Sequence, residues 1–239
     1  MRRRTHPCLF VLLLLASLSA PAQDAAVKAQ VELTRDGHRL KDASSAVIWL
    51  TPLAAPAPVL APQKEWDIPK LVQKDKMFHP SLIVIPVGGK VEFPNHDPFF
   101  HNVFSLFEGK RFDLGLYESG TTRFVQFDKP GISYIFCNIH AQMSAVVIAL
   151  ATPYYAISNS HGDVSLAGVP AGRYQFQVFH SSVAPDDLHA LTREITVGAG
   201  TTSIGTLQLN ESNIELAHKN KYGQDYDRPD PDNPAYARP

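Results

Sequence analysis

The chain consists mainly of short apolar runs separated by turn residues, and several runs alternate between apolar and polar positions. Residues 27–33 and 174–178 show this period of two, which predicts strands with one buried face. An uninterrupted apolar run at 145–150 predicts a strand that is buried on both faces. Further strands are predicted at 46–50, 82–87, 90–93, 101–104, 120–127, 133–136, 195–197 and 203–209. No run has the length and period of a long helix, so the pattern predicts an all-β protein.

Turn and linker residues indicate how these strands are organised. The 19 prolines and 14 glycines favour short strands joined by frequent turns, as in β-sandwiches with Greek-key connections. A Pro/Ala-rich stretch at 52–58 begins a stiff, extended linker. From residue 210 the chain is polar and rich in proline, which predicts a disordered tail over 210–239.

The first residues have the organisation of a secretory signal peptide. Three arginines at 2–4 precede an apolar run at 9–18, and Ala20 and Ala22 provide the small residues before a cleavage point after Ala22. The run is too short to span a bilayer comfortably, and no other stretch comes close. We therefore expect a signal peptide at 1–22, an exported periplasmic protein and no membrane span.

Export changes the interpretation of charge and cysteine content. Without the three arginines, 19 of the 22 basic residues remain against 23 acidic ones, so the net charge moves from −1 to −4. This balance argues against a nucleic-acid partner. Loss of Cys8 leaves Cys137 as the sole cysteine, in a compartment where thiols usually pair. A buried small hydrophobe is the ordinary role of a lone cysteine, but a metal ion would also hold the thiol.

The sequence Cys-Asn-Ile-His-Ala-Gln-Met at 137–143, together with His101, contains a set of copper-binding donors. Two imidazoles and a thiolate with a weak axial thioether form the ligand set of blue-copper electron-transfer sites. The Cys-x2-His-x2-Met spacing allows one tight loop to surround a metal ion. We therefore predict one copper ion, cycling between Cu(II) and Cu(I), bound by His101, Cys137 as thiolate, His140 and Met143.

With these donors in this order, residues 71–151 resemble the cupredoxin family, the type 1 blue-copper domains of amicyanin and plastocyanin type. The resemblance implies a Greek-key β-sandwich in which the Cys-His-Met loop joins the last two strands. It also implies that His140 lies at the solvent edge where partners dock, and that Asn102 braces the cysteine loop. The implied ligand set fills the coordination sphere, which favours carrying electrons over binding a substrate, so we expect an electron carrier and not a catalyst. In agreement, the sequence has no nucleophile elbow, P-loop or dinucleotide fingerprint.

The flanking segments, 23–55 and 152–209, resemble two parts of a carboxypeptidase-regulatory-like module, a small Ig-like or transthyretin-like sandwich. The resemblance depends on the Pro-x-Gly-x-Tyr pattern at 170–174 and the strand that follows it. We therefore expect the cupredoxin sandwich to be inserted in, or packed beside, this smaller sandwich, with 56–70 as a linker. Some periplasmic proteins of this architecture are labelled methylamine utilisation proteins.

The leading hypothesis is an exported type 1 copper protein that carries single electrons between redox partners in the cell envelope, such as a c-type cytochrome or a periplasmic dehydrogenase. The alternatives are a periplasmic copper-binding or copper-handling protein without electron transfer, and a non-catalytic β-sandwich binding protein. His96 and Asp97 are close enough to His101 in sequence to lie around the ligand. Four other histidines are expected to be surface or hydrogen-bonded residues: His79, His161, His180 and His189. An aromatic cluster is expected to belong partly to the core and partly to an apolar docking patch around His140: Phe99, Phe100, Phe104 and Phe107.

Overall fold

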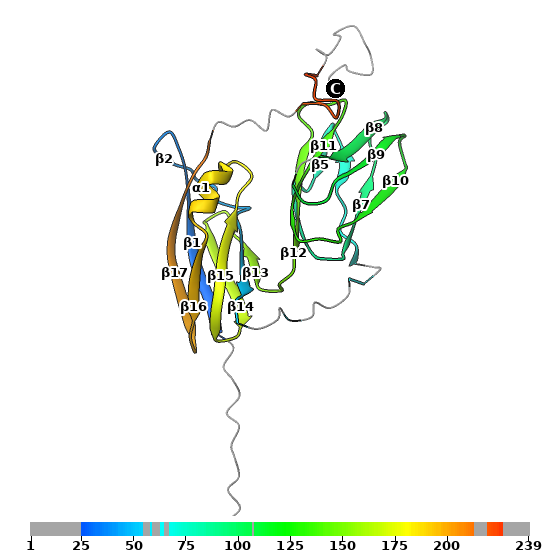
Figure 1. Cartoon of the computed structure of the whole chain (residues 1–239). Helices are drawn as coiled ribbons and strands as arrows, with labels where there is room; N and C mark the ends of the chain where they lie inside the picture. The colour runs from blue at the N-terminus through cyan, green and yellow to red at the C-terminus, as the bar shows by residue number, and fades with distance from the viewer. Residues whose placement is uncertain are drawn as a thin grey trace, which may run out of the picture.

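The computed structural model of the 239-residue chain describes residues 25–54, 58, 63–64, 67–106, 108–212 and 219–226. These residues form almost only β-strands, arranged as two sandwiches that lie side by side (Figure 1). The all-β fold predicted from the pattern is therefore confirmed. The predicted signal peptide at 1–22 and much of the linker at 56–70 lie outside the described residues. None of the helical segments in the described part of the chain has the length and hydrophobicity needed to cross a bilayer.

The terminal sandwich combines strands from both ends of the chain. In one sheet β1 lies between β14, which is antiparallel to it, and β17, which is parallel to it. The other sheet has the order β13-β3-β15-β16. Apart from the short β2, which pairs with β1, the partners of β1 and β3 all come after residue 154, so two separate segments build this sandwich. Its elements are β1 (Ala25–Arg35), β2 (His38–Arg39), β3 (Val47–Pro52), β13 (Tyr155–Ile157), β14 (Asp163–Val169), β15 (Gly172–Phe179), α1 (Pro185–Ala190), β16 (Arg193–Val197) and β17 (Thr201–Asn210).

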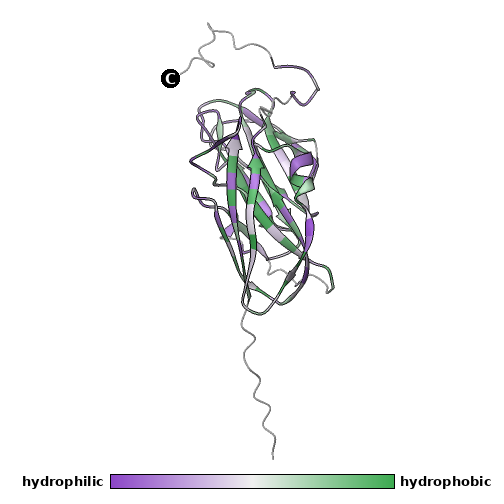
Figure 2. Ribbon diagram, turned by 90° about the vertical axis from the view of Figure 1, so that its left-hand side faces the viewer, coloured by the Kyte–Doolittle hydropathy of each residue, from purple (hydrophilic) through white to green (hydrophobic). Residues whose placement is uncertain are grey.

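Alternating burial holds the two sheets of the terminal sandwich together. Val27, Val31 and Leu33 of β1 are buried in one cluster with Leu50 and Phe176 of the facing sheet. Hydrophobic residues are accordingly concentrated in the strands, whereas most connecting loops are hydrophilic (Figure 2). The apolar residues at every second position of these strands thus form the hydrophobic core between the two sheets.

The turn before β14 depends on a glycine. Gly162 has φ of +83°, and a Cβ at this position would lie 2.0 Å from the carbonyl oxygen of Val31. The amide of Val31 donates a hydrogen bond to the Gly162 carbonyl at 2.8 Å. Only glycine allows the returning segment to approach β1 this closely.

The central sandwich, built from residues 67–150, carries the predicted ligands. One sheet has the order β6-β12-β11-β8-β9; β7 pairs with β10, and the β4–β5 hairpin is bridged to β7. Three of these strands, β4, β5 and β9, were not predicted from the pattern. Its strands are β4 (Val72–Lys74), β5 (Met77–His79), β6 (Leu82–Pro86), β7 (Lys90–Pro94), β8 (His101–Ser105), β9 (Phe112–Tyr117), β10 (Thr122–Gln126), β11 (Gly131–Cys137) and β12 (Ser144–Leu150).

Strand β12 contributes to both hydrophobic cores. Val147 and Ala149 belong to the core of the central sandwich, whereas Val146 and Ile148 belong to the cluster of the terminal sandwich. This explains the uninterrupted apolar sequence of the strand, which is buried on both faces. The two sandwiches therefore pack through the outer face of the five-stranded sheet.

The structure describes residues 210–212 and 219–226 of the predicted tail. β17 continues to Asn210, and residues 219–226 form a hydrogen-bonded turn against the loop between β11 and β12. Figure 1 shows this turn, in red, at the β8–β11 end of the central sandwich. The turn is hydrogen-bonded to a distant part of the chain, and local composition does not indicate such contacts.

Candidate metal centre

Neighbouring strands bring three of the four predicted ligands together. Cys137 is the last residue of β11 and pairs with Val103 of β8, while His101 begins β8 two residues earlier. His140 lies in the loop that follows β11. The loop closes through the Cys137 amide, which donates to the Met143 carbonyl at 3.2 Å, and the Met143 amide, which donates to the His140 carbonyl at 3.1 Å.

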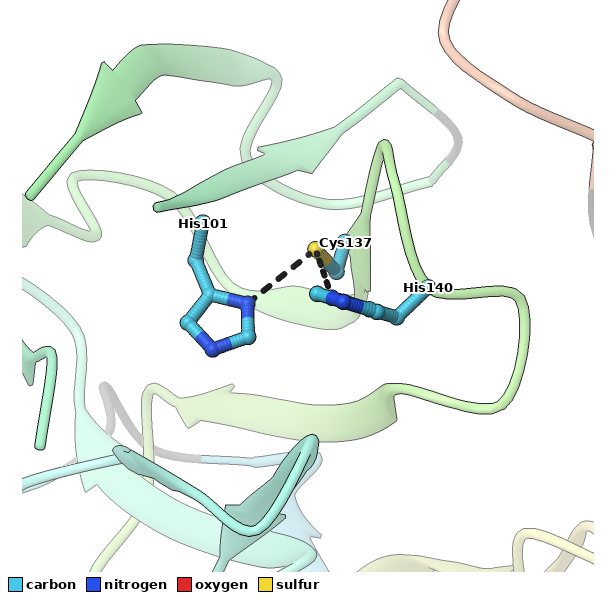
Figure 3. A group of neighbouring side chains, drawn as sticks. All are labelled: His101, Cys137 and His140. Atoms are coloured by element: carbon cyan, nitrogen blue, oxygen red, sulfur yellow. Dashed lines mark hydrogen bonds between the residues drawn. The ribbon is translucent and has the colours of Figure 1, made fainter. Parts of the chain in front are cut away.

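The thiol of Cys137 lies between the two imidazoles. Its Sγ is 3.6 Å from Nδ1 of His101 and 3.5 Å from Nδ1 of His140 (Figure 3). The three candidate ligand atoms all lie within 4.8 Å of one another, and all three residues are buried. Within the described residues, this is the one group of three or more His, Cys, Asp or Glu side chains close enough to share a metal ion.

The spacing of these atoms fits a shared ion. With metal–sulfur and metal–nitrogen bonds of about 2.3 and 2.0 Å, as in zinc sites, ligands about 110–120° apart are separated by about 3.5–3.7 Å. The two observed sulfur–nitrogen distances match this separation. A thiol has a single proton and can donate it to only one imidazole at a time. A cation bound to all three atoms would satisfy both nitrogens and the sulfur together.

Asp97 determines which nitrogen of His101 faces the sulfur. Nε2 of His101 lies 2.7 Å from Oδ2 of Asp97, so the ring donates its proton there and Nδ1 keeps its lone pair toward Cys137. Asp97 is buried and also accepts the backbone amides of Asp75 and Lys76, at 2.7 and 3.0 Å. These hydrogen bonds outweigh burial and lower the pKa of Asp97, so the carboxylate is ionised at neutral pH.

Burial sets the protonation of the three candidate ligands. It raises the pKa of the Cys137 thiol, an effect that backbone hydrogen bonds from Ile139, Asn102 and His140 partly oppose. Burial lowers the pKa of His140 to about 4. The pKa of His101 is also lowered by burial, with Asp97 acting in the opposite direction. Both imidazoles are thus neutral at pH 7, the form that binds metals, and a cation would favour the thiolate.

The other two predicted site residues are buried next to these three. Met143 is fully buried in the core of the central sandwich. Asn102 is buried, and its backbone carbonyl accepts the amide of Asn138 at 3.1 Å. Its side-chain Nδ2 donates to Asp113 at 2.6 Å instead of to the loop. Asn102 therefore contacts the cysteine loop through its backbone and β9 through its side chain.

The aromatic residues divide between the core and the surroundings of the histidines. The half-buried ring of Phe99 lies 5.2 Å from the ring of His101 and 5.6 Å from that of His140. Phe100 is 54% exposed, whereas Phe104 is buried. Phe107 lies outside the described residues. The exposed Phe100 thus follows a ring that packs on both imidazoles.

Several residues around the site were not assigned a role by sequence reasoning. Asp97 was considered only through its proximity to His101 in sequence, and the i, i+4 spacing was the available signal. Asp113, Lys221 and Tyr226 contact the cysteine loop or its neighbours. No local pattern marks them, because each contact joins residues far apart in the chain.

No family model matches the chain, and no curated protein matches it. Among solved structures, the chain is similar to a purple cupredoxin from Nitrosopumilus maritimus at 21% identity, covering 34% of this chain and 99% of that one, with a TM-score of 0.32.

Two further solved structures are each similar to less than half of this chain. A Cu-containing nitrite reductase (NirK) from Thermus scotoductus SA-01 is 25% identical over 42% of this chain and 25% of its own, with a TM-score of 0.34. A reduced Cu(I) amicyanin mutant is 16% identical over 43% of this chain and 98% of its own, with a TM-score of 0.33. TM-scores this low establish neither fold nor function for this chain.

Proposed function

We propose that this chain is an exported type 1 copper protein that carries single electrons between redox partners in the cell envelope. The observation that supports the proposal is the position of the Cys137 sulfur, 3.6 and 3.5 Å from the Nδ1 atoms of His101 and His140. One soft and two borderline donors, buried together on a rigid β-framework, form the ligand set that copper prefers.

Each residue has a distinct role in this proposal. Copper, when bound, supplies a one-electron couple between Cu(II) and Cu(I). Cys137 would hold the ion as thiolate, His101 and His140 would hold it through Nδ1, and Met143 is the proposed weak fourth ligand. Asp97 orients His101 and fixes its tautomer. These donors leave no position for a substrate, so we propose an electron carrier and not a catalyst.

The remaining parts of the proposal concern location and partners. Residues 1–22 serve as the signal peptide for export to the periplasm, residues 71–151 form the copper-binding unit, and the flanking segments form an Ig-like module. A c-type cytochrome or a periplasmic dehydrogenase is a suitable class of redox partner. We propose that partners dock near His140, where the ring of Phe99 packs on the imidazole and the exposed Phe100 follows it in the chain.

Titration of purified apoprotein with Cu(II) tests the proposal. We expect an intense blue or green absorption that saturates at one copper per chain and disappears in Cys137→Ser. The control, His161→Gln, changes an exposed histidine outside the site and should leave the absorption intact. A colourless product, or undiminished colour in Cys137→Ser, would contradict the proposal. Electron self-exchange then separates the two copper hypotheses, since slow exchange with ready release to a chelator favours copper handling.

A further inference from the structure

The C-terminal turn (residues 219–226) has a well-defined structure of its own. Oδ1 of Asn220 accepts the amides of Tyr222 and Gln224, each at 3.0 Å. The backbone of Asn220 also pairs with Gln224 and Gly223, both at 2.9 Å. These bonds close residues 220–224 into a compact turn.

Two hydrogen bonds connect the C-terminal turn to the candidate ligand loop. The backbone amide of Lys221 donates to Oδ1 of Asn138 at 2.8 Å. The half-buried Tyr226 donates its hydroxyl proton to the carbonyl oxygen of Cys137 at 2.6 Å. The acceptors are consecutive residues, the cysteine and the first residue after it. The turn therefore contacts the part of the loop that positions the sulfur.

A third contact joins the C-terminal turn to the strand beside the loop. Nζ of Lys221 lies 2.8 Å from Oδ2 of Asp113, whose other oxygen accepts Nδ2 of Asn102 at 2.6 Å. Asn102 in turn accepts the amide of Asn138 at 3.1 Å. One network thus links β8, β9, the ligand loop and the C-terminal turn.

The charges in this network persist at neutral pH. Burial raises the pKa of Asp113, but hydrogen bonds from Lys221, Asn102 and Gly115 together lower it overall. The hydrogen bond to Asp113 raises the pKa of Lys221. The pair is therefore ionic at neutral pH.

We propose that the C-terminal turn holds the ligand loop closed, with Lys221 and Tyr226 as positioning residues that limit access to the thiol of Cys137. Cys137 is fully buried, so a reagent or a metal ion reaches its sulfur only after the loop opens. Each hydrogen bond from the turn to the loop makes that opening rarer. The proposal applies to the apoprotein and stands whether or not copper is the natural metal.

The test measures the alkylation rate of Cys137 by iodoacetamide in the full-length apoprotein, followed at this residue by peptide mass spectrometry. We expect Tyr226→Phe and Lys221→Met each to react about fivefold faster than wild type, the effect of one lost hydrogen bond or ion pair. Removal of residues 213–239, which keeps β17 intact, should increase the rate about a hundredfold, the product of three such contacts. Lys221→Arg keeps the charge and should restore most of the protection.

Matched controls distinguish a local opening from general destabilisation. Tyr155→Phe and Lys41→Met make the same chemical changes at exposed side chains that belong neither to the C-terminal turn nor to the ligand loop, and should react at the wild-type rate. The thermal unfolding midpoint of each point variant should stay near that of wild type. Wild-type rates in all three test variants would overturn the proposal, as would acceleration that simply follows a lowered unfolding midpoint. Neither readout requires copper, so failure here is separate from failure of the proposed function.

Discussion

Replacing Asp97 with asparagine should destabilise the central sandwich. Asp97 is 3% exposed, and its carboxylate accepts three hydrogen bonds: from the Asp75 amide at 2.7 Å, the Lys76 amide at 3.0 Å and Nε2 of His101 at 2.7 Å. Asp75 and Lys76 form the turn between β4 and β5, and both have φ of +56°, a conformation unfavourable for residues other than glycine. Asp97 therefore stabilises a strained turn and a candidate ligand together.

The size of the effect follows from the hydrogen bonds. An asparagine offers one acceptor oxygen, so one carboxylate contact is lost and an NH2 group faces a backbone donor. A hydrogen bond to a charged group contributes about 1.5–3 kcal/mol, and an unsatisfied buried donor costs about 1–3 kcal/mol. Because asparagine is easier to bury than a carboxylate, we expect a net loss of about 2–4 kcal/mol.

Urea unfolding of the apoprotein at pH 7, followed by circular dichroism, measures this loss. The control Asp128→Asn removes an exposed carboxylate that pairs with Lys110, and should cost less than about 1 kcal/mol. In the copper-loaded protein, Asp97→Asn should also raise the reduction potential, because a negative charge close to the metal favours Cu(II). An unfolding free energy equal to that of wild type would refute the assigned role of Asp97.

Three further predictions concern other parts of the molecule. Burial lowers the pKa of His180, so as the pH decreases the unfolded chain binds a proton at this histidine before the folded chain does. The free energy of unfolding should therefore fall below about pH 6.5, by up to about 1.4 kcal/mol per pH unit. His180→Gln should remove this pH-dependent loss when unfolding curves of the two proteins are measured in parallel. Met143→Leu should raise the copper reduction potential while the colour persists, and an unchanged voltammogram would exclude Met143 as a ligand. Ile148→Ala should cost about 2–5 kcal/mol in chemical unfolding because Ile148 fills the interface between the sandwiches, whereas Ile157→Ala, at a side chain 45% exposed, should cost far less.

Local sequence patterns determined the strand content and half of the candidate site. The alternation in β1 and β15 and the continuous apolar run of β12 depend on which faces a strand buries, and burial leaves a period in the sequence. Cys137 and His140 are three residues apart in one loop, so their proximity follows from the chain itself. The pattern missed β4 and β5, since their turn contains Asp75 and Lys76 with positive φ instead of the usual glycine. It also missed β9, whose alternation Gly115 interrupts.

The tertiary structure alone decided how distant segments meet. Pairing of β8 with β11 places His101 against the sulfur of Cys137, and the carboxylate of Asp97 selects the nitrogen that faces it. The contact of Tyr226 with the carbonyl of Cys137 spans 89 residues and joins the polar C-terminal segment to the ligand loop, a contact that local composition does not indicate. Each of these contacts depends on the summed free energy of many residues folding together. A periodic pattern records only which face of an element is buried, and not which residue it is buried against.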